Sequence, residues 1–379
     1  NETKLNYSTA FSFWVKRSEL GTYQYLIGDA SNQWLAFNHS DQLEVGTSLG
    51  QRYASTSVYR DTSAWMHIYV SYAVGIWIWV NGEMLDDFNG PGIPINASSI
   101  GDSFDGYMSE VYYLGQSAAN SVADFGMTNN DGEWVPVPYR GLYRSDGFYL
   151  PFEADDIGKD HSGQGNDFMI WGLTSDNVVA DTPCNNYCTL NPLAMTRVGL
   201  GTSSVLKNGN LTLSPTGQTA VNATMFVDQG KWYWEYTPSY NTGAQWPKTG
   251  FLYDTAAVPG NGDTPPGQTA GSWCYMANGQ WYAENVYGPT YTPFVAWDTV
   301  QFALDMDAGK AWVGINGTWV TGDPSTGTSP IQAGLAGRIG PSIASVGPTG
   351  SPLDSVNFGQ HSWAYTPPSG YKALCTQNL

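Results

Sequence analysis

The chain has 379 residues, and 33 acidic against 15 basic residues give it a formal net charge of −18. Such a charge excludes nucleic acid and anionic membrane surfaces as partners, and no apolar run approaches the roughly 20 residues of a membrane-inserted helix. Charged residues make up only 13% of the chain and aromatic residues 14%, which predicts a neutral, polar surface and a core large enough for two domains.

The first predicted domain covers residues 1–125. Asn1 opens the chain with neither an initiator Met nor a signal peptide, so we expect a processed chain or a fragment. In residues 10–16 large apolar side chains alternate with smaller or polar ones, the period of a half-buried strand. Further strands are predicted at 23–27, 34–37, 42–45, 65–72, 75–80 and 107–114. Residues 117–125 are small and Ala-rich, which predicts one or two helical turns.

Residues 126–195 are predicted to form an irregular connector with short extended pieces at 134–139 and 147–152. The segment is rich in Gly, Asp, Asn and Pro, which favours loops. It also contains many large apolar residues, too many for a disordered linker, so we expect it to pack on the neighbouring domains.

The second predicted domain covers residues 196–379, with strands at 210–213, 231–236, 249–253, 272–276, 299–305, 311–315 and 355–358. Turn residues at 307–309 and the pair Asn316-Gly317 flank one of these strands and predict an antiparallel meander. The sequence therefore indicates an all-β protein with two antiparallel β-sandwiches.

Two groups of motifs resemble known families. Residues 65–70 (WMHIYV), 76–82 (IWIWVNG) and 106–111 (GYMSEV) resemble successive strands of the LamG, or concanavalin-like, jelly-roll group. Residues 230–236 (GKWYWEY), 298–305, 311–317 and 354–374 resemble a SPRY domain. Residues 147–167 and 179–193 are similar to connectors that join these modules in phage tail and other virion proteins. The resemblance implies binding domains from a virus particle, with partners held on loops at one edge of the SPRY sandwich.

No motif for catalysis was found. Concanavalin-like glycosidases need two carboxylates on one strand face, and the acidic residues nearest to that pattern, in 83–87, follow directly on a turn. A hydrolytic triad also lacks support, because the four histidines are scattered and no Gly-x-Ser-x-Gly motif occurs. We therefore predict that the protein is not an enzyme.

Calcium is the one cofactor that the sequence suggests. Several aspartates lie in predicted turns of the first domain, where oxygen ligands could converge, although no EF-hand spacing is present. They are Asp29, Asp41, Asp86, Asp87, Asp102 and Asp105, and we weigh a calcium site at Asp29, Asp41, Asp102 and Asp105 against ordinary solvated turns.

The four cysteines match no zinc motif. Cys184 and Cys188 are close enough in sequence for a small loop disulfide in an oxidising compartment, and free thiols are the alternative.

Aromatic residues are the candidate ligand-binding groups, because sugar faces stack on rings while neutral polar neighbours satisfy the hydroxyl groups. In 76–80 the alternation places Trp77 and Trp79 opposite the aliphatic face, either as a stacking platform or as packing beneath the connector. Trp34 lies beside a turn-rich stretch. In the second domain, loops carry the remaining candidates, Trp246, Trp281, Tyr282 and Trp319.

These observations lead us to expect a virion-surface, extracellular adhesin that binds a host cell-surface glycan or receptor and contacts other virion proteins. Weak sites of this kind need several copies for avidity, so a homo-oligomer is expected. The alternatives are a structural fibre or capsid-decoration component that mediates subunit contacts and, more remotely, a polysaccharide-degrading glycoside hydrolase.

Overall fold

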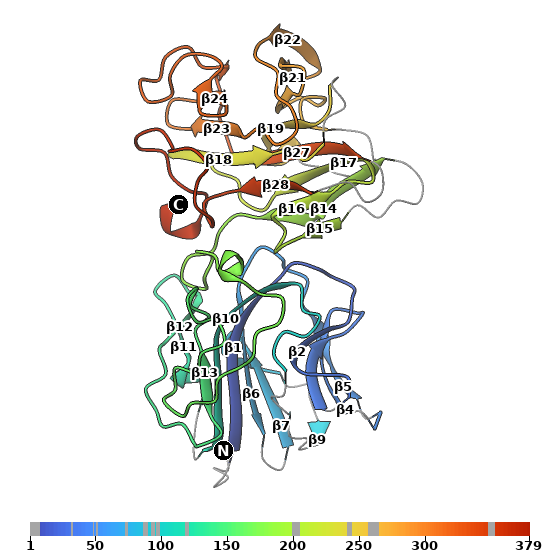
Figure 1. Ribbon diagram of the computed structural model, residues 1–379, viewed down its shortest axis with the longest axis vertical. Helices are drawn as coiled ribbons and strands as arrows, with labels where there is room; N and C mark the ends of the chain where they lie inside the picture. Colours follow the sequence, from blue (N-terminus) through green and yellow to red (C-terminus); the bar gives the residue numbers. More distant parts are fainter. Residues whose placement is uncertain are drawn as a thin grey trace. The chain divides into compact units, whose positions relative to one another are not determined.

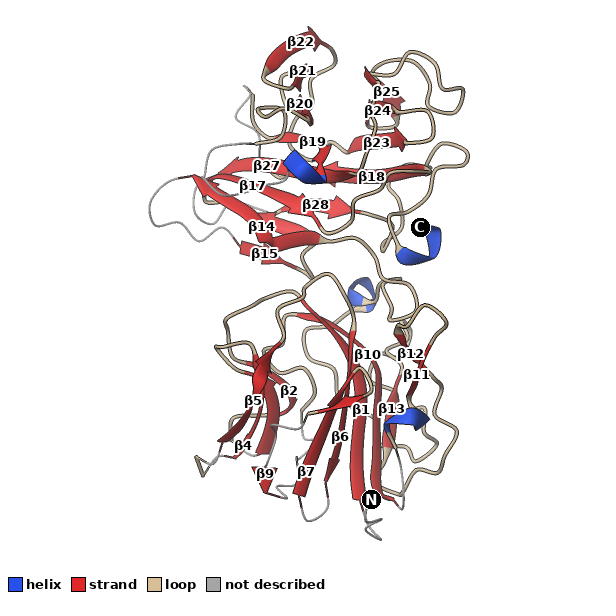
Figure 2. Ribbon diagram, turned by 180° about the vertical axis from the view of Figure 1, so that it is seen from behind, coloured by secondary structure: helices blue, strands red, loops and turns tan. Residues whose placement is uncertain are grey.

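The computed structural model describes residues 8–31, 33–47, 49–50, 52–72, 75–85, 90–91, 95, 99–117, 121–198, 205–240, 245–256, 265–347 and 353–379. Within these residues almost all regular structure is antiparallel β-strand (Figures 1 and 2). Helical segments in the described residues are short 3-10 turns: η1 (Val122–Asp124), η2 (Ser175–Asn177), η3 (Asp254–Ala256) and η4 (Thr376–Asn378). No helix in this part of the chain is long and apolar enough to cross a membrane. The predicted all-β sandwich class is confirmed.

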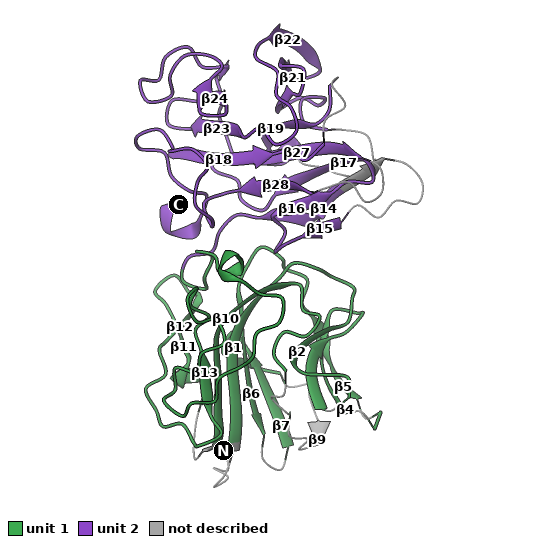
Figure 3. Cartoon of the chain, viewed as in Figure 1, with its two compact units in different colours: residues 1–184 green, residues 185–379 purple. Residues whose placement is uncertain are grey.

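The chain divides into two compact units, residues 1–184 and 185–379 (Figure 3). The predicted connector is therefore split between them: residues 126–184 belong to the first unit and 185–195 to the second. The predicted helical turn appears in part as η1.

The first unit contains a seven-stranded sheet, a four-stranded sheet and a two-stranded ribbon. The seven-stranded sheet has the order β13-β10-β1-β6-β7-β8, with β9 also pairing β7. Its strands are β1 (Ser8–Arg17), β6 (Met66–Tyr72), β7 (Gly75–Val80), β8 (Glu83–Met84), β9 (Gly90–Pro91), β10 (Gly106–Ser117) and β13 (Phe148–Leu150). The smaller sheet has the order β2 (Gln24–Gly28), β3 (Gln33–Phe37), β4 (Gln42–Thr47), β5 (Arg52–Val58), and the ribbon is β11 (Gly126–Thr128) with β12 (Trp134–Pro136).

The main core of the first unit gathers apolar residues from both of its larger sheets. Phe11, Phe13 and Val15 alternate along β1, and all three are fully buried with residues of β2, β3 and β4. A second apolar cluster contains Tyr69 and Phe125. The seven-stranded sheet is therefore buried on both faces, because residues after 125 cover its outer face, which points away from the main core.

Trp134 of the ribbon explains how that outer face is covered. Its indole Nε1 donates to Nδ1 of the buried His67 on β6 at 3.0 Å. A Cβ on Gly82 or Gly126 would stand within about 2.6 Å of the Trp134 ring, so only glycine allows this close approach. The ribbon is thereby fixed against β6.

The second unit contains two larger sheets. The seven-stranded sheet has the order β14 (Leu190–Val198), β17 (Gly217–Ala223), β27 (Ile339–Gly347), β19 (Lys248–Tyr253), β20 (Ser272–Met276), β21 (Gln280–Ala283), β22 (Val286–Thr290). The eight-stranded sheet has the order β15 (Val205–Lys207), β16 (Thr212–Ser214), β28 (Asp354–Asn357), β18 (Lys231–Thr237), β23 (Val300–Asp305), β24 (Lys310–Ile315), β25 (Thr318–Trp319), with β26 (Gln332–Ala333) pairing β24.

The predicted meander in this unit is confirmed, because β23 pairs β24 and β24 pairs β25. The last turn is made by Asn316 and Gly317, whose φ angles of 48° and 82° are the left-handed pair that a tight two-residue hairpin requires. Trp234 and Phe302 stack at 5.0 Å within the core, and Trp234 is almost fully buried. The GKWYWEY motif is therefore part of the framework of the sandwich.

Candidate functional site

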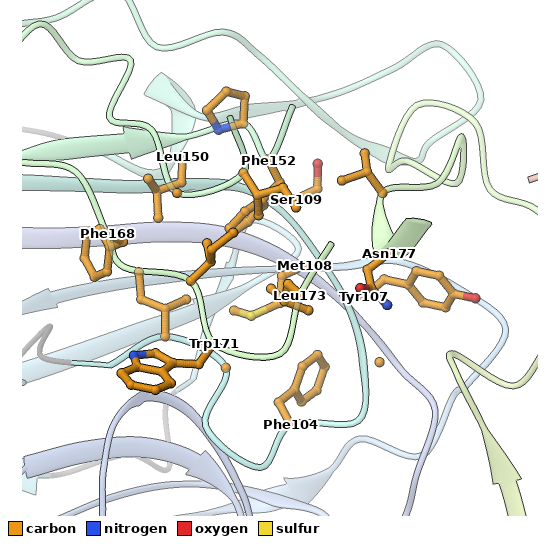
Figure 4. A pocket seen from close by; sticks show the side chains of 18 of the residues that line it. Phe104, Tyr107, Met108, Ser109, Leu150, Phe152, Phe168, Trp171, Leu173 and Asn177 are labelled. Atoms are coloured by element: carbon orange, nitrogen blue, oxygen red, sulfur yellow. The ribbon is translucent and has the colours of Figure 1, made fainter. Parts of the chain in front are cut away.

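A cavity of about 760 Å³ lies in the first unit, where β10 begins and β13 ends. Phe104, Met108 and Phe152 line it and also pack against the main core, so the floor of the cavity is continuous with the core. Figure 4 shows the rings of Phe168 and Trp171 among the side chains that line it, from the loop that follows β13.

The rim of this cavity is unusually apolar and open. In the segment 169–173, Trp171 is 82% exposed and Met169 is 77% exposed, and Ile170 and Leu173 are exposed as well. All four side chains line the cavity. An apolar segment on the surface, beside a preformed hollow, is typical of a surface that binds something.

Neutral polar groups complete the lining. Ser103, Ser109 and Asn177 can donate and accept hydrogen bonds, which suits a ligand rich in hydroxyl groups. Asp102 and Asp181 are the acidic residues among the lining residues.

Asp181 is engaged with its neighbours in the protein. Its Oδ2 accepts from Lys16 Nζ at 2.8 Å and its Oδ1 accepts from Trp65 Nε1 at 2.8 Å. Asp181 and Lys16 are both buried, so the pair anchors the end of the first unit to β1. A carboxylate held in this way is poorly suited to exchange protons with a substrate.

The aromatic candidates of the first unit differ in exposure. Trp34 is 3% exposed and its Nε1 donates to Tyr23 Oη at 2.9 Å, so it has no open face for a ligand and belongs to the packing of the small sheet. Trp79 is half-buried against Tyr69, with ring centroids 5.2 Å apart. Trp77 is 37% exposed. The predicted two-ring platform is thus reduced to Trp77.

The structure also corrects the candidates of the second unit. Trp281 and Tyr282 are each 4% exposed, and Trp281 lies in the core cluster, so neither presents a ring to a ligand. Trp319 is half-buried on β25 of the eight-stranded sheet, against the cluster of Tyr233 and Trp312, whereas Trp246 precedes β19 of the other sheet. Trp281 therefore cannot present a ring at the predicted edge, whereas a binding role for Trp246 and Trp319 stays a prediction.

Tyr240, Tyr287 and Trp297 are exposed rings of the second unit, and together with the half-buried Trp246 we call them the aromatic edge. Gln245 Nε2 donates to Tyr287 Oη at 3.3 Å, which ties the segment before β19 to β22. Trp297 is 66% exposed, and its backbone N–H donates to the carbonyl oxygen of Pro238 at 2.7 Å.

Backbone contacts hold the segments of the aromatic edge together. Ala277 N donates to Pro247 O at 3.1 Å, and Phe294 N donates to Ala277 O at 3.0 Å. The Lys248 ammonium lies 4.7 Å from the Trp246 ring centroid. Burial lowers the pKa of this lysine. The aromatic edge is a second candidate binding surface.

The four aspartates weighed for calcium do not gather in one place. Asp41 is buried, and its Oδ1 accepts from Arg17 Nη2 at 3.0 Å and from Gly21 N at 2.7 Å. A carboxylate already neutralised by a buried guanidinium is not available to calcium. Asp29 accepts from the backbone N–H of Ser31 in a local turn. Asp102 lies at the cavity and Asp105 precedes β10.

Asp86 and Asp87 lie outside the described residues. Within the described residues, the cluster of three or more metal-ligand side chains is elsewhere, at Glu153, Asp156 and His161.

All four cysteines are thiols in this structure: Cys184 is exposed at the end of the first unit, and Cys188 is buried in the second. The Thr224 hydroxyl donates to Cys188 Sγ at 3.8 Å. A disulfide between Cys184 and Cys188 stays a prediction.

Trp171 and Trp297 are the ring candidates that sequence reasoning missed. Both sit in segments without strand alternation, so no period marks one face as exposed. The signal that was present is local: Trp171 precedes a glycine, and Trp297 follows a loop rich in Pro and Thr.

No family model matches the sequence, and the comparison with curated proteins found no match. Among solved structures, the chain is similar to the SPRY domain of human HERC1, with 20% identity over 46% of this chain and 99% of that chain at a TM-score of 0.34. A human SPRY domain matches at 13% identity over 44% of this chain and 99% of its own, with a TM-score of 0.32. The TRIM65 PSpry domain matches at 14% identity over 47% and 93%, with a TM-score of 0.33.

Proposed function

We propose that the protein is a non-enzymatic, virion-surface adhesin that binds a host-surface glycan or receptor. The observation that carries this proposal is the cavity of the first unit, with Trp171 open at its rim and neutral polar groups in its lining. A ring face beside hydroxyl and amide groups is the combination that recognises a sugar. The sequence resemblance to LamG and SPRY modules of virion proteins supports the viral, extracellular setting.

The same cavity supports binding over hydrolysis. A glycosidase needs two carboxylates that can act as acid and base or nucleophile. Of the two acidic side chains in the cavity lining, Asp181 already accepts from Lys16 and Trp65. A glycan held here would be bound without a pair of free carboxylates beside it.

The test is a glycan array and a host-cell binding assay with three proteins: the unchanged chain, Trp171→Ala and Trp297→Ala. Both tryptophans are exposed, so both substitutions should leave folding stability unchanged to within about 0.5 kcal/mol. Loss of one stacking ring should weaken glycan binding by about tenfold in Trp171→Ala. Trp297→Ala removes an exposed ring of the aromatic edge instead. If the cavity is the adhesive site, this variant should bind as the unchanged chain does, and loss of binding in Trp297→Ala alone would move adhesion to the aromatic edge.

A structural role in the particle is the second candidate, and the apolar segment 169–173 favours it, because such a surface also suits burial against another subunit. Host-cell binding that is unchanged in Trp171→Ala would contradict the cavity as the adhesive site. A uniform oligomer that binds no cell surface, and that dissociates in Trp171→Ala, would replace the adhesin with the structural role. Light scattering after size-exclusion chromatography measures the second outcome.

A further inference from the structure

Glu153, Asp156 and His161 form a cluster that neither the cavity nor the aromatic edge uses. One potential ligand atom from each side chain lies within 4.8 Å of the other two. The cluster combines an imidazole nitrogen with two carboxylates, which is a donor set found around zinc in proteins.

The backbone holds the histidine and one acid in place. His161 lies beside β13, because its backbone N–H donates to the carbonyl oxygen of Tyr149 at 2.8 Å. Asp156 N donates to Glu153 O at 3.1 Å, which closes a turn between the two acids. The neighbouring Asp160 carboxylate accepts from the N–H of Tyr149 at 3.0 Å and so ties this loop to the strand.

The Asp160 carboxylate also accepts from the N–H groups of Ser162 at 2.8 Å and Asn166 at 2.9 Å. The loop is thus ordered by its own hydrogen bonds before any ion binds.

The separation between His161 and Asp156 has the length expected for two ligands of one ion. His161 Nε2 and Asp156 Oδ2 are 3.5 Å apart, longer than a normal nitrogen–oxygen hydrogen bond. Two ligands bound to one tetrahedral zinc at about 2.1 Å each lie about 3.4 Å apart. The observed separation therefore matches one edge of such a site.

The second oxygen of Asp156 is open to a ligand. The Asp156 side chain is 38% exposed as a whole, but its Oδ1 is screened from solvent and has no hydrogen-bond partner in the structure. A bound cation would compensate this oxygen and the surrounding negative charge.

We propose that Glu153, Asp156 and His161 bind one divalent transition-metal ion of the zinc type. The histidine nitrogen favours zinc over calcium, which takes oxygen ligands. The ion would fix the segment between Phe152 and Ile157, and both of these residues line the cavity.

Zinc itself is the probe, used with the full chain. Equilibrium dialysis should retain one zinc ion per chain at this site, and His161→Ala should weaken that binding by at least about tenfold, since even the loss of a supporting group costs that much. Glu153→Gln is a milder second variant that preserves the shape of the side chain. His39→Ala is the matched control, because it removes another exposed histidine of the same unit.

X-ray absorption at the zinc edge identifies the ligands and separates this site from the thiols. Nitrogen and oxygen neighbours without sulfur are expected, with the signal lost in His161→Ala and retained in His39→Ala. No retained zinc, zinc bound through sulfur, or equal affinity in the unchanged chain, His161→Ala and Glu153→Gln would overturn the proposal. None of these outcomes depends on glycan binding, so the adhesin proposal is tested separately.

Discussion

His67 should make the stability of the protein depend on pH in a way that one substitution removes. The side chain is fully buried on β6, and burial lowers its pKa to about 3. Trp134 Nε1 can only donate, so it fixes Nδ1 as the acceptor and leaves the proton on Nε2, which contacts Ser12 Oγ at 2.8 Å. The buried imidazole is therefore neutral and fully engaged.

The sign of the effect follows from the two pKa values. The unfolded chain binds a proton at His67 below pH of about 6.5, whereas the folded chain does not until about pH 3. Between these values the unfolded state holds more protons, so stability falls as the pH falls. From pH 7 to pH 5 this one group should remove about 2 kcal/mol from the free energy of unfolding.

Urea denaturation of the unchanged chain and of His67→Gln, at pH 7 and at pH 5, measures this contribution. Gln can still donate and accept hydrogen bonds but does not titrate, so its loss of stability between the two pH values should be about 2 kcal/mol smaller. Carboxylates contribute equally to both proteins and cancel. His39→Gln, at an exposed site, should behave as the unchanged chain does. Equal pH dependence in His67→Gln and the unchanged chain would refute the reasoning.

Two further substitutions test the packing of the first unit. Asp41→Ala should lower the free energy of unfolding by about 3–5 kcal/mol, because it removes the carboxylate beside the Arg17 guanidinium, which is 1% exposed. A cost below about 1 kcal/mol in urea denaturation would contradict the importance of this buried pair. Calcium should not change the melting temperature of either protein. Gly126→Ala should lower the free energy of unfolding by about 1–3 kcal/mol, because the new Cβ would lie 2.4 Å from the Trp134 ring. A melting temperature equal to that of the unchanged chain would show that the ribbon can move away from the added methyl group without cost.

Strands with clear alternation were predictable, and strands built from small residues were not. The prediction at 231–236 matches β18, and all of its rings are buried: Trp232, Trp234 and Tyr236 in the main core and Tyr233 in a separate cluster with Trp312. β27 was missed although it lies in the middle of its sheet, between β17 and β19. Its sequence IGPSIASVG is buried on both faces, and small residues there leave no period of two to detect.

The connector shows a second limit of sequence reasoning. Its large apolar residues correctly indicated packing, and the extended pieces predicted at 134–139 and 147–152 contain β12 and β13. The pairing of β13 with β10 was not predictable, because a strand of three residues carries no pattern that identifies its partner. The exposure of Trp171 depends on contacts far away in the sequence, because it is set by where the loop after β13 runs beside the cavity. In the same way, Trp281 is buried by core residues from both sheets of the second unit.

A cavity with one exposed stacking ring limits the affinity with which one chain can bind a cell surface. One ring and a few hydrogen bonds give a weak contact, because association also costs several kcal/mol of lost rotational and translational freedom. Linking several copies raises avidity by about 10²–10⁴ without any new contact, provided that the cavities can engage one surface together. If the adhesin proposal holds, binding should therefore depend more steeply on the number of linked chains than on any one lining residue. A monomeric preparation would then bind glycan only weakly even with Trp171 intact.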